Sequence, residues 1–361
     1  MSDRRLRPVP AVFRRRLLPA AAALALLLPL PAVRAWSGSI HRAVTIRAAR
    51  SAPYREMGAF RDWAWCLGYP SACPDLWRMS DRDAEAPRHW FETDRFPGGR
   101  IPPGLAACTN EADAFALAGI PRDALGDAPW ATLVLLGWMT DAMRTNDWIR
   151  AARCAATLSH YVADLHQPLH CTRNFNGQET GQHGVHTRFE TDLPAKFFDR
   201  RGLRAARPRY IADPLPELVE WGRQSTELVP EVLAADLDAT RAAGGIPGAP
   251  GYYEFLWDAT GHIVSNRLNE AATRIASLYY TAWIDAGRPA IPAPPEEIPT
   301  DSIWSGVAAD PEVEAARRAA RTAPQRRLLL VVAAGAIGAF FLLLAFRTVA
   351  NERAKARIRR K

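Results

Sequence analysis

The segment His160-Tyr-Val-Ala-Asp164-Leu-His166-Gln-Pro-Leu-His170 is the most informative stretch of this chain. Side chains four residues apart lie on one face of a helix, so His160 and Asp164 can bind one cation together. The same spacing recurs at His186-Thr-Arg-Phe-Glu190. Imidazole and carboxylate ligands without thiolate are typical of hydrolytic zinc sites with open positions. The pattern predicts a metal site in a helical protein, although one isolated pair of this kind is more often a surface ion pair or a capped core histidine.

The sequence around this segment predicts helices. Apolar residues recur at helical spacing over 130–169 and again over 254–283, and the central region shows no sustained strand-like alternation. Glycine- and proline-rich stretches at 96–99 and 244–248 separate the helical segments. We therefore expect an all-α fold with a single multi-helix domain over residues 36–286.

Both ends of the chain carry targeting signals. Residues 1–35 combine arginines, the apolar run 17–30 and the small-residue pattern Val33-Arg34-Ala35, which predicts a signal peptide cleaved after Ala35. An uncleaved N-terminal anchor is the alternative. Residues 328–346 are uncharged and apolar, so we expect a transmembrane helix at 327–347.

The segments next to the predicted span define its orientation. A basic tail at 348–361 follows the span and places the C-terminus in the cytoplasm. The Pro-, Ala- and Glu-rich segment that precedes it predicts a linker at 287–326. The domain is therefore expected to be membrane-anchored and extracytoplasmic, either periplasmic or extracellular.

The charge of the chain is concentrated at its two ends. The whole chain carries +8, and residues 1–35 and 347–361 carry +6 each, which leaves −4 on residues 36–346. A basic chain usually suggests a nucleic-acid or anionic-lipid partner, but here the excess positive charge belongs to targeting and topology. The expected catalytic domain itself is mildly acidic.

The chain has an odd number of cysteines, namely Cys66, Cys73, Cys108, Cys154 and Cys171. Disulfides persist in the predicted compartment. A bond between Cys66 and Cys73 could close a short loop, but the sequence does not determine the pairing, and at least one cysteine must be free or intermolecular.

The segment 160–170 resembles the HxxxDxHQPLH motif of the superfamily of zinc-dependent phospholipases C and fungal single-strand-specific nucleases. Trp36 directly follows the predicted cleavage site, and His41 comes five residues later. Asp75-Leu-Trp-Arg78 and His89-Trp-Phe-Glu92 resemble further motifs of the superfamily. The resemblance covers most of residues 36–286. It implies an all-helical fold with three zinc ions per chain, one of them bound by a processed N-terminal tryptophan.

The resemblance also implies a ligand set for each zinc ion. The first set is Asp75, His89, His160 and Asp164. The second is His170, His186 and Glu190, with positions left open for water and substrate. The third is the amine and carbonyl of Trp36, His41 and the other oxygen of Asp164, so that Asp164 bridges two ions.

The implied reaction is phosphodiester hydrolysis. Divalent cations lower the pKa of water enough to supply hydroxide near neutral pH, and we expect in-line attack with cleavage of a P–O bond. Asp75 is a candidate catalytic residue that orients or deprotonates the nucleophile. Arg78 either donates to a phosphate oxygen or acts as the partner of Asp75. His166 lies off the ligand face, so we expect a structural role for it.

The motifs leave the substrate open. Gly184-Val-His186-Thr-Arg-Phe-Glu190 looks like the phospholipase pattern, whereas the Trp36–His41 spacing looks like that of the nucleases and 3'-nucleotidases. Trp90 and Phe91 could stack on a base, cage a choline cation or simply pack in the core; with Glu92 they are the candidate substrate-binding residues.

We favour phospholipase C-like activity on phospholipid headgroups over hydrolysis of single-stranded nucleic acid. A zinc-binding module without turnover is the remaining alternative. The sequence indicates no oligomeric state.

Overall fold

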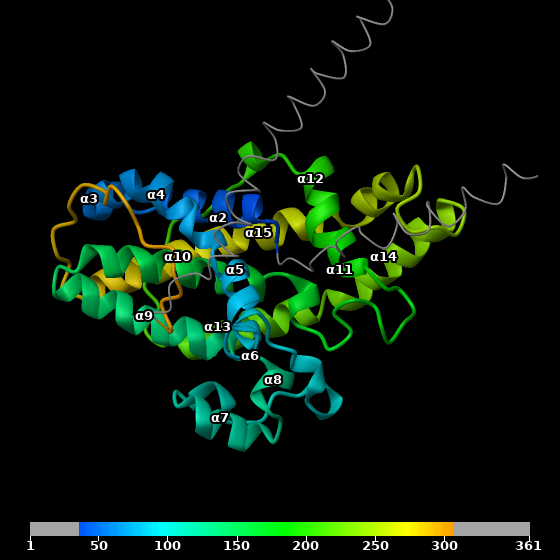
Figure 1. Cartoon of the computed structure of the whole chain (residues 1–361), viewed down its shortest axis with the longest axis horizontal. Helices are drawn as coiled ribbons and strands as arrows, with labels where there is room; N and C mark the ends of the chain where they lie inside the picture. The colour runs from blue at the N-terminus through cyan, green and yellow to red at the C-terminus, as the bar shows by residue number, and fades with distance from the viewer. Residues whose placement is uncertain (1–35, 306–361) are drawn as a thin grey trace, which may run out of the picture.

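Helices make up the regular structure of residues 36–305, the part of the chain that the computed structural model describes (Figure 1). No strand occurs within these residues, so the predicted all-α fold is confirmed. The α-helices are α2 (Gly38–Arg50), α3 (Tyr54–Met57), α4 (Ala64–Gly68), α5 (Pro74–Ser80), α6 (Arg82–Glu85), α7 (Glu111–Ala118), α8 (Arg122–Leu125), α9 (Ala128–Arg144), α10 (Trp148–Leu165), α11 (Val185–Thr187), α12 (Leu193–Phe197), α13 (Pro214–Thr226), α14 (Val229–Ala242) and α15 (Tyr252–Asp285).

Short 3₁₀ helices and one π-helical turn connect the α-helices. They are η2 (Gly58–Trp63), η3 (Pro70–Ala72), η4 (Ala86–His89), η5 (Thr93–Arg95), η6 (Pro97–Gly99), η7 (Leu105–Ala107), η8 (Pro168–His170), the π-helical η9 (Arg188–Asp192) and η10 (Arg200–Gly202). Between residues 36 and 305 no helix has the length and apolar character needed to span a bilayer. The predicted signal peptide, transmembrane helix and basic tail lie outside the described residues.

Helix α10 lies at the centre of the domain. It packs against α9, α2, α13 and α15, and Figure 1 shows α9 and α10 running side by side. The side chain of Asp147 caps its first turn by accepting a hydrogen bond from the Arg150 N–H. Four buried alanines, at 151, 152, 155 and 156, let neighbouring helices approach closely. A helix buried on nearly all sides carries His160 and Asp164 into the interior.

The chain turns sharply where α10 ends. Pro168 lacks an N–H and disfavours a helical conformation in Gln167, so the helix cannot continue. The Gln167 side chain accepts a hydrogen bond from the Leu169 N–H and caps the short η8 that follows. This turn, rather than a continuous helix, brings His170 back toward the ligands on α10.

Helix α15 is the longest element of the domain. It has 34 residues and packs against α14, α2, α9 and α10. At about 1.5 Å per residue it is roughly 50 Å long, and it supplies one wall of the core along most of the domain. The predicted helix at 254–283 is confirmed by this element.

The segment 287–305, which we call the C-terminal strap, lies against the domain instead of forming a linker. The indole N–H of Trp63 donates to the Pro292 carbonyl, and that of Trp77 donates to the Thr300 carbonyl. Ile298 is 6% exposed and belongs to the hydrophobic core. The first part of the linker expected at 287–326 thus packs on the domain through a buried isoleucine and backbone carbonyls, and residues 306–326 lie outside the described residues.

No disulfide forms among the cysteines of residues 36–305. The thiol of Cys66 donates to the Trp63 carbonyl, and that of Cys73 to the Tyr69 carbonyl. The short loop considered from the sequence is therefore not closed in this structure.

Ile298→Ala tests the packing of the strap. Removal of a buried isoleucine side chain should lower the free energy of unfolding by about 2 kcal/mol or more, whereas a linker residue should tolerate the change. The matched control is Ile246→Ala, because Ile246 is 66% exposed; we expect less than about 0.5 kcal/mol there. Equal, small losses in chemical denaturation would contradict the packed strap.

Candidate metal centre

Four predicted ligands meet between α5, η4 and α10. Nδ1 of His89 lies 3.0 Å from Asp164 Oδ2, and Nε2 of His160 lies 3.3 Å from the same oxygen. Oδ1 of Asp75 is 3.9 Å from His160 Nε2. Ligand atoms of Asp75, His89 and His160 all lie within 4.8 Å of one another, close enough to hold one ion. The first predicted ligand set is thus brought together from distant parts of the chain.

A second group shares two of these residues. Nε2 of His41, on α2, lies 3.4 Å from Asp164 Oδ1, and the His41 and His160 rings stack with centroids 3.8 Å apart. Ligand atoms of His41, His160 and Asp164 also lie within 4.8 Å of one another, so these residues could hold a second ion. The indole of Trp36 is buried and donates to the Ala163 carbonyl at 3.2 Å, next to Asp164 in the chain. Trp36 is therefore held beside the group it is predicted to complete.

The third group lies where η8 approaches α11 and η9. Nε2 of His170 is 3.2 Å from Glu190 Oε2, and Nε2 of His186 is 3.1 Å from the same oxygen. All three side chains are buried. Three protein ligands are the number found at catalytic zinc sites that keep a position for water or substrate.

Backbone carbonyls fix the orientation of three histidines. The Nδ1–H of His160 donates to the Ser71 carbonyl at 2.8 Å, that of His170 to the His89 carbonyl at 2.6 Å, and that of His186 to the Phe175 carbonyl at 3.1 Å. Each bond leaves Nε2 as the nitrogen that faces the carboxylates. Such outer hydrogen bonds are characteristic of metal-binding histidines, because they set the tautomer and the ring orientation.

Gln167 has a role that the sequence analysis missed. It is fully buried, and its amide donates to Glu190 Oε2 at 3.0 Å while its oxygen caps η8. One side chain therefore links the turn that places His170 to the carboxylate of the same group. Its position between His166 and His170 of the motif is the feature of the sequence that could have indicated this role.

Several buried polar atoms of the centre have no hydrogen-bond partner within the described residues: both ring nitrogens of His41, Oδ1 of Asp164 and Oε1 of Glu190. A buried polar atom without a partner costs about 1–3 kcal/mol, and native proteins contain few of them. Here they gather in one place on nitrogen and carboxylate ligands. These residues fit a set of bound divalent cations.

The electrostatics of the centre favour cations. Burial alone would raise the pKa of Asp164, but His170, His160 and His41 hold it well below its usual range. Burial alone would lower the pKa of His170, but Asp164 and Glu190 raise it to about 9. The carboxylates are thus ionised in the interior, stabilised by the neighbouring histidines; a bound cation would take the place of the proton that the raised pKa of His170 favours.

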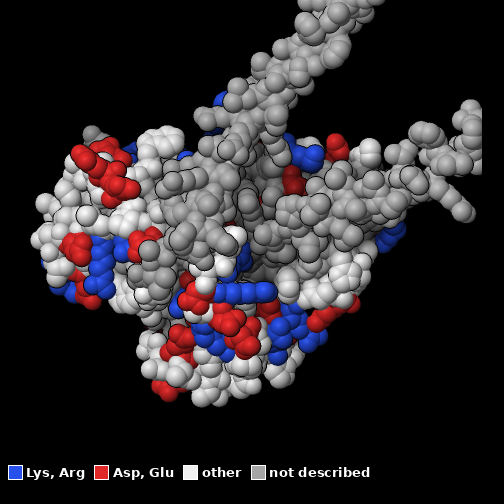
Figure 2. Space-filling model, viewed as in Figure 1, with Lys and Arg blue, Asp and Glu red and all other residues white. Residues whose placement is uncertain are grey.

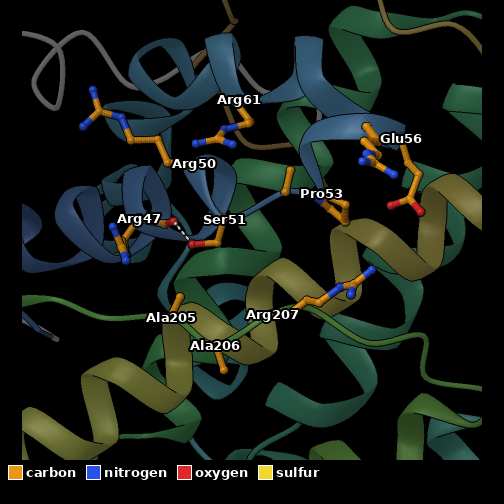
Figure 3. A pocket seen from close by; sticks show the side chains of 11 residues that line it. Arg47, Arg50, Ser51, Pro53, Glu56, Arg61, Ala205, Ala206 and Arg207 are labelled. Carbon is orange, nitrogen blue, oxygen red and sulfur yellow. Dashed lines mark hydrogen bonds between the residues drawn. The ribbon is translucent and has the colours of Figure 1, made fainter.

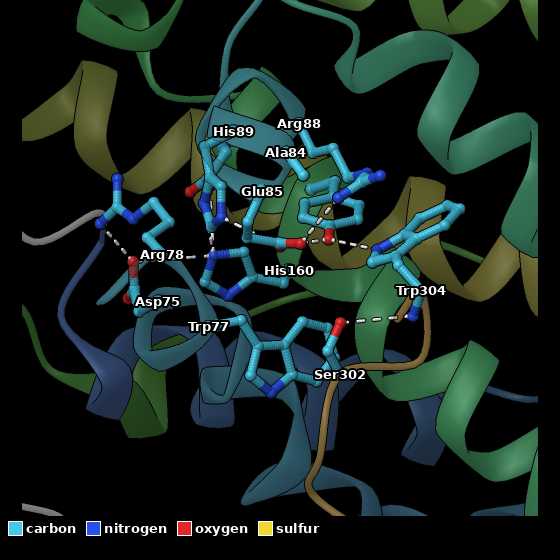
Figure 4. A network of polar contacts seen from close by, with 12 residues as sticks. Asp75, Trp77, Arg78, Ala84, Glu85, Arg88, His89, His160, Ser302 and Trp304 are labelled. Atoms are coloured by element: carbon cyan, nitrogen blue, oxygen red, sulfur yellow. Dashed lines mark hydrogen bonds and ion pairs between the residues drawn. The ribbon is translucent and has the colours of Figure 1, made fainter. Parts of the chain in front are cut away.

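Arg78 is bonded to Asp75 rather than turned toward open space. Its Nη2 lies 2.6 Å from Asp75 Oδ1, and Figure 4 shows the guanidinium on the outer side of that carboxylate, away from His160. Of the two roles considered for Arg78, the structure contains the partnership with Asp75.

A polar network behind His89 reaches the C-terminal strap (Figure 4). Glu85 Oε1 lies 3.4 Å from His89 Nε2 and accepts the hydroxyl hydrogen of Tyr161. The indole N–H of Trp304 donates to the Tyr161 oxygen at 2.9 Å, and the guanidinium of Arg88 lies 4.2 Å from the Trp304 ring centroid. The strap is therefore connected to a predicted metal ligand, which no sequence motif indicated.

Of the candidate substrate-binding residues, Phe91 is in the core. It is fully buried, its ring centroid lies 5.7 Å from that of Trp130, and a Cβ on Gly222 would lie 2.8 Å from it. Stacking on a base or caging a choline is thus excluded for Phe91 in this structure, because helix packing covers the ring. Trp90 is half-buried and packs over Gly126, where a Cβ would lie 2.1 Å from the Trp90 carbonyl oxygen.

Glu92 is buried and paired with Arg95. Burial raises the pKa of Glu92 to about 7, although Arg95 acts in the opposite direction. Its carboxyl group is thus an ionisable group of the interior that titrates near neutral pH.

The remaining histidines lie apart from the candidate metal ligands. His166 is fully buried, with Nδ1 2.6 Å from the Val162 carbonyl and Nε2 2.9 Å from the Arg274 guanidinium, so its predicted structural role is confirmed. His183 is exposed in its turn, and His262 is 59% exposed beside Glu231.

No model of a known protein family matches the chain, and a search of curated proteins finds no match either. The functional assignment therefore depends on the motifs and on the geometry of the three groups.

Asp164→Asn tests the shared carboxylate. The change preserves size but removes the charge used by the first two groups, so these groups should lose zinc while the His170 group keeps its ion. Atomic spectrometry of the purified protein measures the zinc content. The exposed His262→Asn variant should keep the wild-type content. An Asp164→Asn protein with undiminished zinc would contradict the bridging role.

Glu92→Gln tests the buried carboxyl group. Because folding raises the pKa of Glu92 from 4.5 to about 7, the stabilisation from its protonated form is complete below about pH 4.5 and is lost as the pH rises through about 7. The variant should therefore gain stability relative to wild type between about pH 5 and pH 8, by on the order of 2 kcal/mol. Thermal unfolding at both pH values measures this difference. The exposed Glu296→Gln variant is the control, and a pH-independent difference for Glu92→Gln would contradict the assignment.

Proposed function

We propose that the domain is a zinc-dependent phosphodiester hydrolase. The observation that carries this proposal is the position of Asp164 between two groups of ligands. Its Oδ1 faces His41, and its Oδ2 faces His89 and His160. A carboxylate with its two oxygens directed at different ligand groups suits a pair of neighbouring cations, and such pairs stabilise the attacking and leaving oxygens of an in-line displacement.

We assign different roles in that reaction to different residues of the centre. Zinc ions held here would lower the pKa of a bound water and neutralise charge on the phosphoryl oxygens. Asp75 is the only one of the first four ligands with partial exposure, and its hydrogen bond from Arg78 orients it. We assign to Asp75 the orientation of the nucleophile and acceptance of its proton. Cleavage after Ala35 would free the Trp36 amine as a further ligand.

Phe175 is the best-placed residue for substrate contact. It is 40% exposed, and its ring centroid lies 6.0 Å from that of His186, a ligand of the third group. An aromatic ring at the mouth of that group can pack against an organic substituent of a phosphate ester.

Two observations support a phospholipid headgroup over a polynucleotide. Among the described residues visible in Figure 2, acidic and basic side chains are interspersed rather than gathered into the continuous basic track of a polynucleotide groove. The loop that carries Phe175 is bonded to Asp94, which accepts hydrogen bonds from Thr172 and the Arg173 N–H, and to Glu179, which pairs with Arg173. Carboxylates on or bonded to the loop of an exposed aromatic ring are compatible with a cationic headgroup such as choline.

A substrate panel tests the function. The protein processed to begin at Trp36 and supplied with zinc should release phosphocholine from phosphatidylcholine faster than it degrades single-stranded DNA. The reverse order would replace the phospholipase activity with the nuclease activity and leave the metal centre intact. No turnover of either substrate by zinc-loaded protein would favour a binding module. Asp164→Asn is the inactive control for both substrates.

A further inference from the structure

An arginine-lined pocket of about 440 Å³ lies on the domain at the C-terminal end of α2. We call it the arginine pocket; its arginines are Arg47, Arg50, Arg55, Arg61 and Arg207. Figure 3 shows Arg47, Arg50 and Arg61 on helical segments and Arg207 on the extended segment that passes beneath them. Glu56 is the single acidic residue among its lining residues. The pocket therefore combines five positive charges with one negative charge, in a domain that is otherwise mildly acidic.

The arginine pocket is separate from the metal centre. Arg47 follows His41 by six residues on α2, which corresponds to about 9 Å along the helix axis. The buried face of α2 carries Ile40, His41, Val44, Thr45 and Ala48, whereas Arg50 is exposed. One helix thus contributes a ligand to the metal centre near its start and arginines to a different surface near its end.

Three arginines of the pocket, Arg47, Arg55 and Arg207, lack the carboxylate partners that arginines have elsewhere in the described domain. Arg153 pairs with Asp301, and Arg188 pairs with Asp236. Within residues 36–305 no carboxylate pairs with Arg47, Arg55 or Arg207, and the buried Nε of Arg47 has no hydrogen-bond partner. Like charges collected around a hollow repel one another, and a bound anion would remove that repulsion. Guanidinium groups match phosphate oxygens in geometry as well as in charge.

An exposed tryptophan lies at the edge of this basic surface. Trp65 is 67% exposed, the largest exposed fraction among the big apolar side chains of the described residues. The guanidinium of Arg50 lies 4.9 Å from its ring centroid. Tryptophan rings are enriched at the headgroup level of membranes, and clustered arginines are attracted to anionic lipid surfaces. The two features together distinguish this surface from a simple anion pocket.

We propose that the arginine pocket and Trp65 form a docking surface for anionic membranes, in which a lipid headgroup phosphate enters the pocket and the indole lies among the headgroups. An open pocket of this size matches one headgroup, whereas a polynucleotide needs a track of basic residues along its backbone. The proposal goes beyond the proposed function, because it requires neither zinc nor turnover.

Hydrogen–deuterium exchange tests the docking on the full-length protein. The protein is measured with nanodiscs of phosphatidylcholine alone and with nanodiscs that also contain phosphatidylglycerol. Segments 47–65 and 205–207 should exchange more slowly with the anionic nanodiscs, by about five-fold or more, since one arginine near an anionic surface contributes about that factor. High salt should reduce the protection. Segment 160–190 of the metal centre reports separately on binding there.

Three variants make the test specific. Arg50→Gln, Arg55→Gln and Arg207→Gln combined should abolish the protection, and Trp65→Ala should reduce it. Arg100→Gln, Arg144→Gln and Arg241→Gln combined remove the same charge from exposed arginines elsewhere and should preserve it. Thermal unfolding of each variant confirms that it is folded.

Four results would overturn the proposal. They are equal exchange with neutral and anionic nanodiscs, full protection by inorganic phosphate with neutral nanodiscs, protection only by single-stranded DNA, and unchanged protection in the arginine-pocket variant.

Discussion

The buried carboxylate of Asp164 is the constraint on which the rest of the structure depends. An ionised carboxylate in a protein interior is costly unless opposite charges and hydrogen-bond donors surround it. His89 and His160 lie within 3.3 Å of its Oδ2, and His41 lies 3.4 Å from its Oδ1. These histidines come from η4, α10 and α2, so the packing of three separate segments is required to stabilise one charge. The same arrangement leaves nitrogen and oxygen atoms positioned for cations.

The precision of this arrangement comes from the atoms behind the ligands. Backbone carbonyls of Ser71, His89 and Phe175 hold the Nδ1–H groups of three histidines, and Gln167 holds Glu190. Carbonyls are fixed by the fold itself, so each ring has little freedom to rotate away. The candidate ligands are thus preorganised by backbone as well as by side chains.

The C-terminal strap extends this support beyond the predicted domain boundary. Trp304 donates to Tyr161, Tyr161 donates to Glu85, and Glu85 lies beside His89. A tryptophan far along the chain therefore contributes to the surroundings of a predicted metal ligand. Residues 287–305 belong physically to the same domain as the centre, since they bury Ile298 and satisfy the indoles of Trp63 and Trp77.

The sequence by itself determined the helical class and the candidate ligands. Helical periodicity and the four-residue spacing of His160 with Asp164, and of His186 with Glu190, depend only on local geometry. The motif resemblance supplied the grouping of the ligands. The tertiary structure decided which aromatic side chains are accessible to a substrate. Phe91 is covered by Trp130 and α13, whereas Phe175 remains partly exposed. It also placed the strap, the Glu85–Tyr161–Trp304 network and the arginine pocket, because contacts between residues far apart in the chain leave no periodic signal in the sequence.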